Sequence, residues 1–408
     1  MMRTLTALSA FLFSISLPTS TTSLPHSPSP SSKSNTSTAS IWSTSKFHGV
    51  NLGGWLVQEK SLDTKWWQSV APNATDEWTM CTFLGPEKCS SVLEERYATW
   101  ITTDTIDTLA SVGVNLLRIP STYAAWIDLP GSGLYSGNQL VYLREITEYA
   151  IEKYGMHIIL DIHSLPGGLN GLDIGEKVGN WGWFFNGTAW FQSLDVMEKV
   201  VEFIASSSSP ESFTLEPMNE PADLNGNDNL GMSVFGTPAA LSDEGASYVM
   251  AFWKAVLSRV RSLESELGLQ VGEIPIGLQS FKLPSYWGTN FTVADNVLFD
   301  MHNYYFEGRN TTSANLEGYM LSDAEVKQPL RDVQIPVFIG EWAIQAAADN
   351  ELQLRGSNVR RGLEIWKDYM SGSAYWAARF EGLDEVSGEG TKRDYWSFER
   401  FIELGYLD

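Results

Sequence analysis

The sequence predicts a single (β/α)8 barrel, a TIM barrel with loop insertions. Eight short, nearly continuous apolar runs alternate with mostly helical links along the chain. Runs of this kind are typical of strands that are buried on both faces of a parallel sheet. Two of the runs lead to a glutamate, Glu220 and Glu341, and strand ends are where a barrel presents its functional groups.

The strands follow one another from residue 47 onward. Helical periodicity marks the links at 92–110, 139–153, 188–205 and 245–267. A doubly wound open sheet is the alternative, but a Gly-rich phosphate-binding turn would be expected after an early strand of such a sheet. The sequence has no G-x-G-x-x-G or P-loop motif. The strands are expected at 47–52, 114–119, 156–163, 213–218, 274–279, 296–302, 335–339 and 373–377.

The segments before the barrel have a different character. Residues 1–20 are expected to be a secretory signal peptide, because Arg3 precedes an apolar stretch that is too short to span a bilayer and breaks at Pro18. A retained signal anchor is the alternative. Residues 21–45 are rich in Ser, Thr and Pro and are expected to be a disordered leader. The barrel domain is then expected over residues 46–408.

Composition narrows the class of partner. The net charge of −22 argues against nucleic acid, anionic membranes and polyanionic substrates, and it suits a neutral ligand. The five histidines show no metal-binding spacing such as H-E-x-x-H. No G-x-S-x-G motif of a serine hydrolase occurs either. We expect a monomer with no membrane span, no metal and no other cofactor.

Two features suit an exported chain. Cys81 and Cys89 lie eight residues apart in an expected polar loop, a spacing that indicates one local disulfide, because a metal site would need further Cys or His nearby. Sequons for N-glycosylation, which fit a eukaryotic secretory route, begin at Asn35, Asn73, Asn186, Asn290 and Asn310.

Polar and aromatic residues stand at the ends of most expected strands. Because barrel strands all open on one face at their carboxyl ends, residues far apart in the sequence should converge there. A single histidine or tryptophan of this kind is more often part of the core, but so many coincident placements favour a common site. The residues are Glu59, Arg118, His163, Asn219 with Glu220, His302 with Tyr304, Glu341 and Trp376.

With these residues in view, the chain resembles the family 5 glycoside hydrolases, and within them the fungal exo-β-1,3-glucanases. The resemblance covers about residues 47–380, and the order and spacing of its motifs make it specific. The matching stretches are Gly49–Val57 with Glu59, Leu117–Pro120, Asp161–Gly171, Asn219–Pro221, His302 with Tyr304, Gly340–Trp342, and Trp376.

The resemblance implies a secreted or cell-wall-associated exo-acting glucan 1,3-β-glucosidase. It makes Glu220 the acid/base and Glu341 the nucleophile of a retaining mechanism, and Trp376 the floor under the sugar. Glu59 and Asp173 match positions that bind the hydroxyls of the terminal glucose. The supporting residues are Arg118, His163, Asn219, His302 and Tyr304.

A retaining mechanism needs two carboxyl groups with different pKa values. We expect Glu341 to be ionised, since it should lie beside Arg118 and within hydrogen-bond reach of Tyr304. Glu220 should be kept protonated by burial and by the negative charge of Glu341. Either glutamate alone would be compatible with a surface salt bridge, but the pair favours glycoside hydrolysis.

One stretch departs from the exo-glucanase pattern. Those enzymes carry an aromatic residue, Asp and Asn where this chain has Leu172, Asp173 and Ile174. The insertion that follows, residues 175–185, holds four aromatic residues and is expected to rebuild an aromatic wall.

This departure leaves the glycosidic linkage and the leaving group open. The first alternative is a diglycosidase that releases a disaccharide such as rutinose from flavonoid glycosides. Non-catalytic carbohydrate-binding or structural cell-wall proteins are remote alternatives, because both glutamates are present.

Overall fold

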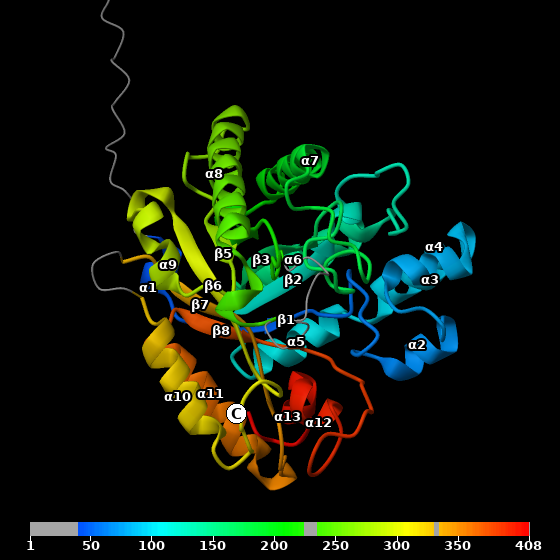
Figure 1. Ribbon diagram of the computed structural model, residues 1–408, viewed down its shortest axis with the longest axis vertical. Helices are drawn as coiled ribbons and strands as arrows, with labels where there is room; N and C mark the ends of the chain where they lie inside the picture. Colours follow the sequence, from blue (N-terminus) through cyan, green and yellow to red (C-terminus); the bar gives the residue numbers. More distant parts are fainter. Residues whose placement is uncertain (1–39, 224–234, 330–333, 408) are drawn as a thin grey trace, which may run out of the picture. The chain divides into compact units, whose positions relative to one another are not determined.

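The computed structural model describes residues 40–223, 235–329 and 334–407. Their parallel strands form a closed barrel in sequence order, with β8 pairing back onto β1 (Figure 1). The predicted (β/α)8 barrel is therefore confirmed. Its strands are β1 (Phe47–Asn51), β2 (Leu116–Thr122), β3 (His157–Ser164), β4 (Phe213–Glu216), β5 (Ile276–Gln279), β6 (Val297–Tyr305), β7 (Val337–Ala346) and β8 (Gly372–Tyr375).

The helical links differ from the expectation in two respects. The stretch 92–110 is not one helix, because it is divided between α4 and α5, and Thr102 caps the start of α5. Helices α9, α10 and α11 occupy links where no helix was expected. The helices are α1 (Ile41–Thr44), α2 (Thr64–Val70), α3 (Glu77–Leu84), α4 (Pro86–Thr99), α5 (Thr103–Ser111), α6 (Gln139–Tyr154), α7 (Gly187–Ala205), α8 (Asp243–Glu266), α9 (Pro284–Trp287), α10 (Leu316–Lys327), α11 (Arg355–Tyr369), α12 (Arg393–Trp396) and α13 (Phe398–Glu403).

Side chains that alternate along the strands fill the barrel in layers. The layer at the amino-terminal ends is apolar and contains Leu116 of β2, Ile159 of β3 and Leu298 of β6. Two residues further along these strands stand Arg118, Asp161 and Asp300, all fully buried. Because residues two apart on a strand share a face, the interior of the barrel changes from an apolar layer to a charged layer within two residues.

Trp42 closes the apolar end of the barrel. Its side chain is 1% exposed, and its indole Nε1 donates to Thr214 Oγ1 at 2.9 Å. Its ring packs at 4.7 Å from that of Phe47 and at 5.0 Å from that of Phe338. Residues 40–45, which were expected to belong to the leader, are therefore part of the folded unit. Residues 1–39, with the expected signal peptide and the sequon at Asn35, lie outside the described residues.

Cys81 and Cys89 form the predicted disulfide, with their Cα atoms 4.9 Å apart. They lie in α3 and α4, so the expected polar loop is in fact two helices joined at Gly85. In the described part of the chain, no helix is long and apolar enough to cross a membrane. Glycosylation stays a prediction at four exposed asparagines, namely Asn73, Asn186, Asn290 and Asn310.

We expect Trp42→Ala to lower the free energy of unfolding by about 3–5 kcal/mol, because removing a buried tryptophan leaves a cavity. Chemical denaturation followed by circular dichroism measures this change. Thr44→Ala is the control, since Thr44 is exposed on the same helix, and its effect should stay within about 0.5 kcal/mol. Equal stabilities of the two variants would contradict the role of Trp42 in the barrel.

Candidate active site

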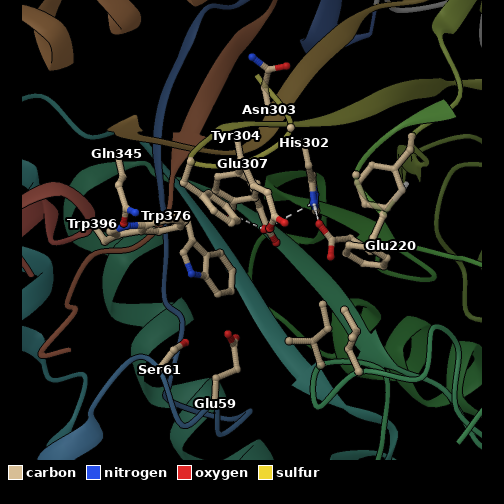
Figure 2. Close-up of a pocket in the computed structure, with 18 of the residues that line it drawn as sticks. Glu59, Ser61, Glu220, His302, Asn303, Tyr304, Glu307, Gln345, Trp376 and Trp396 are labelled. Atoms are coloured by element: carbon tan, nitrogen blue, oxygen red, sulfur yellow. Dashed lines mark hydrogen bonds and ion pairs between the residues drawn. The ribbon is translucent and has the colours of Figure 1, made fainter. Parts of the chain in front are cut away.

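A cavity of about 490 Å³ opens beyond the carboxyl ends of the strands. This volume lies within the range of about 300–1,000 Å³ that is usual for small-molecule sites. Figure 2 shows Glu59 and Trp376 on one side of the cavity and Glu220 with His302 on the other. The predicted site residues that line it are Glu59, His163, Asp173, Glu220, His302, Tyr304, Glu341 and Trp376. The other two, Arg118 and Asn219, are fully buried and hydrogen-bonded to each other.

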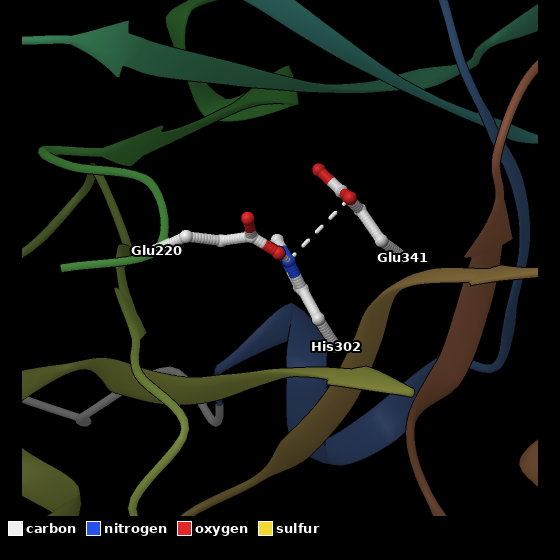
Figure 3. Close-up of side chains that lie close together, drawn as sticks. All are labelled: Glu220, His302 and Glu341. Carbon is white, nitrogen blue, oxygen red and sulfur yellow. Dashed lines mark hydrogen bonds and ion pairs between the residues drawn. The ribbon is translucent and has the colours of Figure 1, made fainter. Parts of the chain in front are cut away.

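Glu220 and Glu341 meet at His302 (Figure 3). The imidazole Nδ1 lies 2.7 Å from Glu220 Oε1 and 3.5 Å from Glu341 Oε2. One carboxylate oxygen of Glu220 and one of Glu341 lie within 4.8 Å of each other. Both glutamates are only 4% exposed. The sequence prediction that these two carboxyl groups converge is thus met by the geometry.

The backbone of Glu220 is held in an uncommon conformation. Its φ angle is +50°, in the left-handed region that residues other than glycine rarely adopt. Its N–H donates to Gln279 Oε1 at 2.6 Å, and its C=O accepts from Asn170 Nδ2 at 3.2 Å. Side chains that follow β3 and end β5 therefore fix the carboxyl group that follows β4.

Glu341 lies within β7, and both of its carboxylate oxygens are bound. Arg118 Nη1 donates to Oε1 at 2.7 Å, and Tyr304 Oη donates to Oε2 at 2.7 Å. These are the two partners that the sequence predicted for Glu341. A carboxylate with a bound cation and a hydrogen-bond donor is held in one orientation and favours its ionised form.

The peptide before Glu341 is clamped from two sides. The N–H of Gly340 donates to Asp300 Oδ1 at 2.5 Å, and the C=O of Gly340 accepts from Asn51 Nδ2 at 2.7 Å. A Cβ atom at Gly340 would lie 2.0 Å from Asp300 Oδ2. Only glycine allows this approach, and the approach positions Glu341.

The surroundings shift the pKa values of the two glutamates in opposite directions. Burial raises the pKa of Glu220, against the opposing effect of its hydrogen bond with His302. Burial would also raise the pKa of Glu341, but the positive charges of His302 and Arg118 outweigh it and leave that pKa lowered. One carboxyl group is thereby prepared to hold a proton, and the other to remain an anion.

Sequence reasoning missed the buried acids beneath the cavity. Asp161 Oδ2 lies 3.2 Å from Arg118 Nη2, and Glu216 Oε2 lies 2.7 Å from Arg118 Nε. Asp161 Oδ2 also lies 2.5 Å from Nδ1 of His163. A signal was present in the sequence, because an aspartate stands two residues before a histidine on both β3 and β6, and residues two apart on a strand share a face.

The pKa of His302 is strongly raised by its surroundings. Burial alone would lower its pKa, but the charge of Glu341 and the contacts with Asp300 and Glu220 raise it to about 10. The atoms of Glu220, His302 and Glu341 are near enough to one another to hold a metal ion. These three residues are joined through the imidazole of His302, whose Nδ1 lies 2.7 Å from Glu220 Oε1.

The opposite side of the cavity offers a flat aromatic face and two carboxyl groups. The rings of His163 and Trp376 stack with their centroids 5.7 Å apart and their planes 11° apart. Glu59 Oε1 is buried without a hydrogen-bond partner among the described residues. Burial raises the pKa of both Glu59 and Asp173. An aromatic face with converging polar groups suits a small polyhydroxylated ligand.

The 175–185 insertion does not build the expected aromatic wall, because none of its four aromatic side chains is among the residues that line the cavity. Trp183 is fully buried and packs in the core against Tyr248, with ring centroids 5.2 Å apart, while Phe185 is 63% exposed. Leu172 and Ile174 line the cavity themselves. Besides the predicted Tyr304 and Trp376, aromatic side chains that the sequence reasoning missed line the cavity, namely Phe235, Phe281, Phe306, Phe380 and Trp396.

We expect Asp300→Asn to lower the pKa of His302 from about 10, because a carboxylate 3.5 Å from Nε2 would become neutral. The ¹⁵N chemical shifts of labelled histidine imidazoles, followed as a function of pH, measure the change. Asp323→Asn, a change at a residue that pairs with Arg309 instead, should leave the titration unaltered. An unaltered His302 titration in Asp300→Asn would show that Asp300 does not support the imidazolium.

Comparisons with known proteins identify the family of the chain. The family model described as cellulase (glycosyl hydrolase family 5) matches residues 78–382. The probable glucan 1,3-beta-glucosidase A of Aspergillus fumigatus is 26% identical over 311 residues, which cover 76% of this chain and 68% of that protein. The glucan 1,3-beta-glucosidase 1 of Schizosaccharomyces pombe is 26% identical over 306 residues, which cover 74% of this chain and 69% of that protein.

Two crystal structures are more similar in sequence. The rutinosidase from Aspergillus niger is 51% identical with a TM-score of 0.85, and the match covers 90% of this chain and 99% of that one. AoRut is 53% identical with a TM-score of 0.84, and the match covers 90% of this chain and 98% of that one. The chain belongs to glycosyl hydrolase family 5 and is an O-glycosyl hydrolase.

Proposed function

We propose that the chain is a retaining β-glycosidase with Glu341 as the nucleophile and Glu220 as the acid/base. The observation that carries this is the pair of buried carboxyl groups, which have oxygens within 4.8 Å of each other and pKa values displaced in opposite directions. Retaining enzymes keep their two carboxyl groups about 5–5.5 Å apart, whereas inverting enzymes need about 6.5–9.5 Å to admit a water.

In this mechanism Glu341 attacks the anomeric carbon while Glu220 gives its proton to the departing glycosidic oxygen. The carbon–oxygen bond breaks, and a covalent glycosyl ester forms on Glu341. Glu220, now ionised, then takes a proton from the water that hydrolyses this ester. Asn219, whose Oδ1 accepts from Arg118 at 3.0 Å, would present its amide to the sugar 2-hydroxyl, and Trp376 would support the ring.

The two glutamates should respond differently to substitution. Glu341→Gln removes the attacking charge, so hydrolysis of every substrate should fall by roughly 10⁴-fold or more. Glu220→Ala should slow ordinary substrates by about 10²–10⁴-fold but spare a dinitrophenyl glycoside, whose leaving group needs no proton. Azide should rescue Glu220→Ala and yield a β-glycosyl azide, which chromatography and NMR identify.

The surface variant Glu202→Gln in α7 is the control and should retain wild-type rates. If Glu220→Ala lost activity on every substrate and Glu341→Gln kept its activity on the dinitrophenyl glycoside, the two roles would be reversed. Wild-type rates in both would exclude this carboxylate pair from catalysis.

For the substrate, we propose a diglycosidase that releases an intact disaccharide such as rutinose from flavonoid glycosides. Two observations support it. The chain is about twice as similar to the rutinosidase structure as to the glucan glucosidases. Leu172 and Ile174 line the cavity where the exo-glucanase pattern places an aromatic ring and an amide. An apolar wall without that amide leaves room for a second sugar on the terminal glucose.

An exo-acting glucan 1,3-β-glucosidase is the second candidate. Glu59 and Asp173 favour it, since both line the cavity at positions where carboxylates would bind the hydroxyls of a terminal glucose. Hydrogen bonds from these two carboxylates to the terminal glucose would close the cavity beyond the first sugar, so the enzyme would remove single glucose units from a chain end.

Product analysis distinguishes the two candidates. Rutin, laminarin and a 4-nitrophenyl β-glucoside are incubated with the purified protein, and the products are separated by chromatography. We expect rutinose as an intact disaccharide from rutin and little glucose from laminarin. Ile174→Asn should shift the ratio of kcat/KM values toward the glucoside, whereas Val271→Asn, at an exposed position, should not. Efficient release of glucose from laminarin alone would favour the glucanase.

We also propose that the chain is exported. The apolar stretch after Arg3, the disulfide between Cys81 and Cys89 and the exposed sequon asparagines support this. Mass spectrometry of the protein from culture medium would identify its amino terminus and any glycans.

A further inference from the structure

The catalytic cavity has a cationic end that the mechanism above does not use. Asn303, Arg309 and Lys327 line the cavity together with the catalytic glutamates. Figure 2 shows Asn303 beyond His302, with its side chain pointing away from Glu220. We refer to Asn303, Arg309 and Lys327 as the Lys327 subsite.

The Lys327 subsite lies at the leaving-group end of the cavity. Glu220, the proposed acid/base, follows β4, and the subsite is built from β6 and from the elements after it. Glu59, Asp173 and Trp376 follow β1, β3 and β8, so the residues proposed to hold the sugar come from other strands than the Lys327 subsite. A leaving group protonated by Glu220 therefore extends toward the loops that follow β4, β5 and β6.

Lys327 is a buried cation that forms no salt bridge among the described residues. It is the last residue of α10 and is 9% exposed, although lysine is almost never fully buried unless it is paired. Its Nζ donates to Asn303 Oδ1, a neutral acceptor. No salt bridge joins it to a carboxylate within residues 40–223, 235–329 and 334–407. An ammonium has three donors, so donor capacity remains on a wall of the cavity.

The nearby aspartate is already committed to other partners. Asp323 Oδ2 accepts from Arg309 Nη1 at 2.6 Å and from Asn303 Nδ2 at 3.0 Å. Glu307 also lines this end of the cavity, but it is exposed, and solvent screens its charge. Burial lowers the pKa of Lys327 to about 8, against the opposing effect of the charge of Asp323, so its amine is still protonated in acidic and neutral solution.

The chemistry around the Lys327 subsite defines the ligand. Phe235 and Phe281 pack edge to face with ring centroids 5.1 Å apart, and both line the cavity together with Phe306. Aromatic side chains in the same cavity as Glu220 and a buried ammonium without a salt bridge among the described residues suit a flat aromatic group that carries an anion.

We propose that the Lys327 subsite binds a carboxylate carried by an aromatic leaving group. The substrates favoured by this subsite are β-glycosides of phenolic acids, in which the sugar is attached to the phenol oxygen and the carboxylate reaches Lys327. This inference rests on the proposed function, because it assigns the leaving group of the same hydrolysis.

The test compares acids with their amides. Glycosides of 4-hydroxybenzoate and 4-hydroxycinnamate, which differ in reach, are compared with the glycosides of the matching carboxamides. The ratio of kcat/KM for acid over amide is measured in the wild type and in Lys327→Met. Dividing one ratio by the other cancels the intrinsic reactivity of the two leaving groups.

We expect the ratio to fall by about tenfold or more in Lys327→Met for at least one of the two acids, because a charge-assisted hydrogen bond is lost. Lys392→Met, at a half-exposed lysine that lines the cavity and pairs with Asp384, should keep the wild-type ratio. An unchanged ratio in Lys327→Met would overturn the proposal.

Calorimetry with the wild-type protein tests the subsite without turnover and without any variant. Free 4-hydroxycinnamate should bind at least about tenfold more tightly than its amide at pH 6, and this preference should fall above the pKa of Lys327, which is about 8. If the acid binds preferentially but no glycoside is hydrolysed, the subsite stands and the proposed function is wrong. If glycosides are hydrolysed without any preference for the acid, the subsite is wrong and the proposed function stands.

Discussion

The centre of the barrel depends on one buried guanidinium. Arg118 is fully buried and lies within 4.0 Å of carboxylate oxygens of Asp161, Glu216, Asp300 and Glu341. Removing one partner of a buried ion pair typically costs about 3–5 kcal/mol, because the remaining charge is left uncompensated. Here the loss would leave several carboxylates without their common counterion. The same guanidinium therefore stabilises the interior and orients Glu341. Burial raises the pKa of Glu216, which reduces the excess of negative charge around it.

This arrangement also explains how two glutamates of one cavity acquire different protonation states. Glu341 is bound directly by Arg118 and Tyr304, so its negative charge is compensated. Glu220 lies farther from the guanidinium and has His302 as its hydrogen-bond partner. Because His302 contacts both glutamates, any change in its charge acts on both of them. The buried acids under the cavity, Asp161 and Asp300, are in this sense positioning residues of the site.

The sequence was less informative about the walls of the cavity than about its centre. Strand-end residues such as Glu220 and His302 are placed by the regular period of two along a strand, so their convergence could be predicted. Loop aromatics follow no such period. Trp183 was expected in the cavity wall but packs in the core against Tyr248. Phe281, in the segment after β5, and Trp396, the last residue of the short helix α12, line the cavity instead, and neither position gave a sequence signal.

The sequence by itself determined the barrel, its eight strands and the residues that meet at the carboxyl ends of those strands, because apolar periodicity and parallel topology fix which side chains share a face. It also determined the local pairing of Cys81 with Cys89. Only the tertiary structure decided that Trp42 closes the barrel, that Arg118 is surrounded by four carboxylates and that Lys327 lies on the cavity wall. Each of these depends on contacts between segments far apart in the chain, and the distance between such segments is set by packing, which no local pattern encodes.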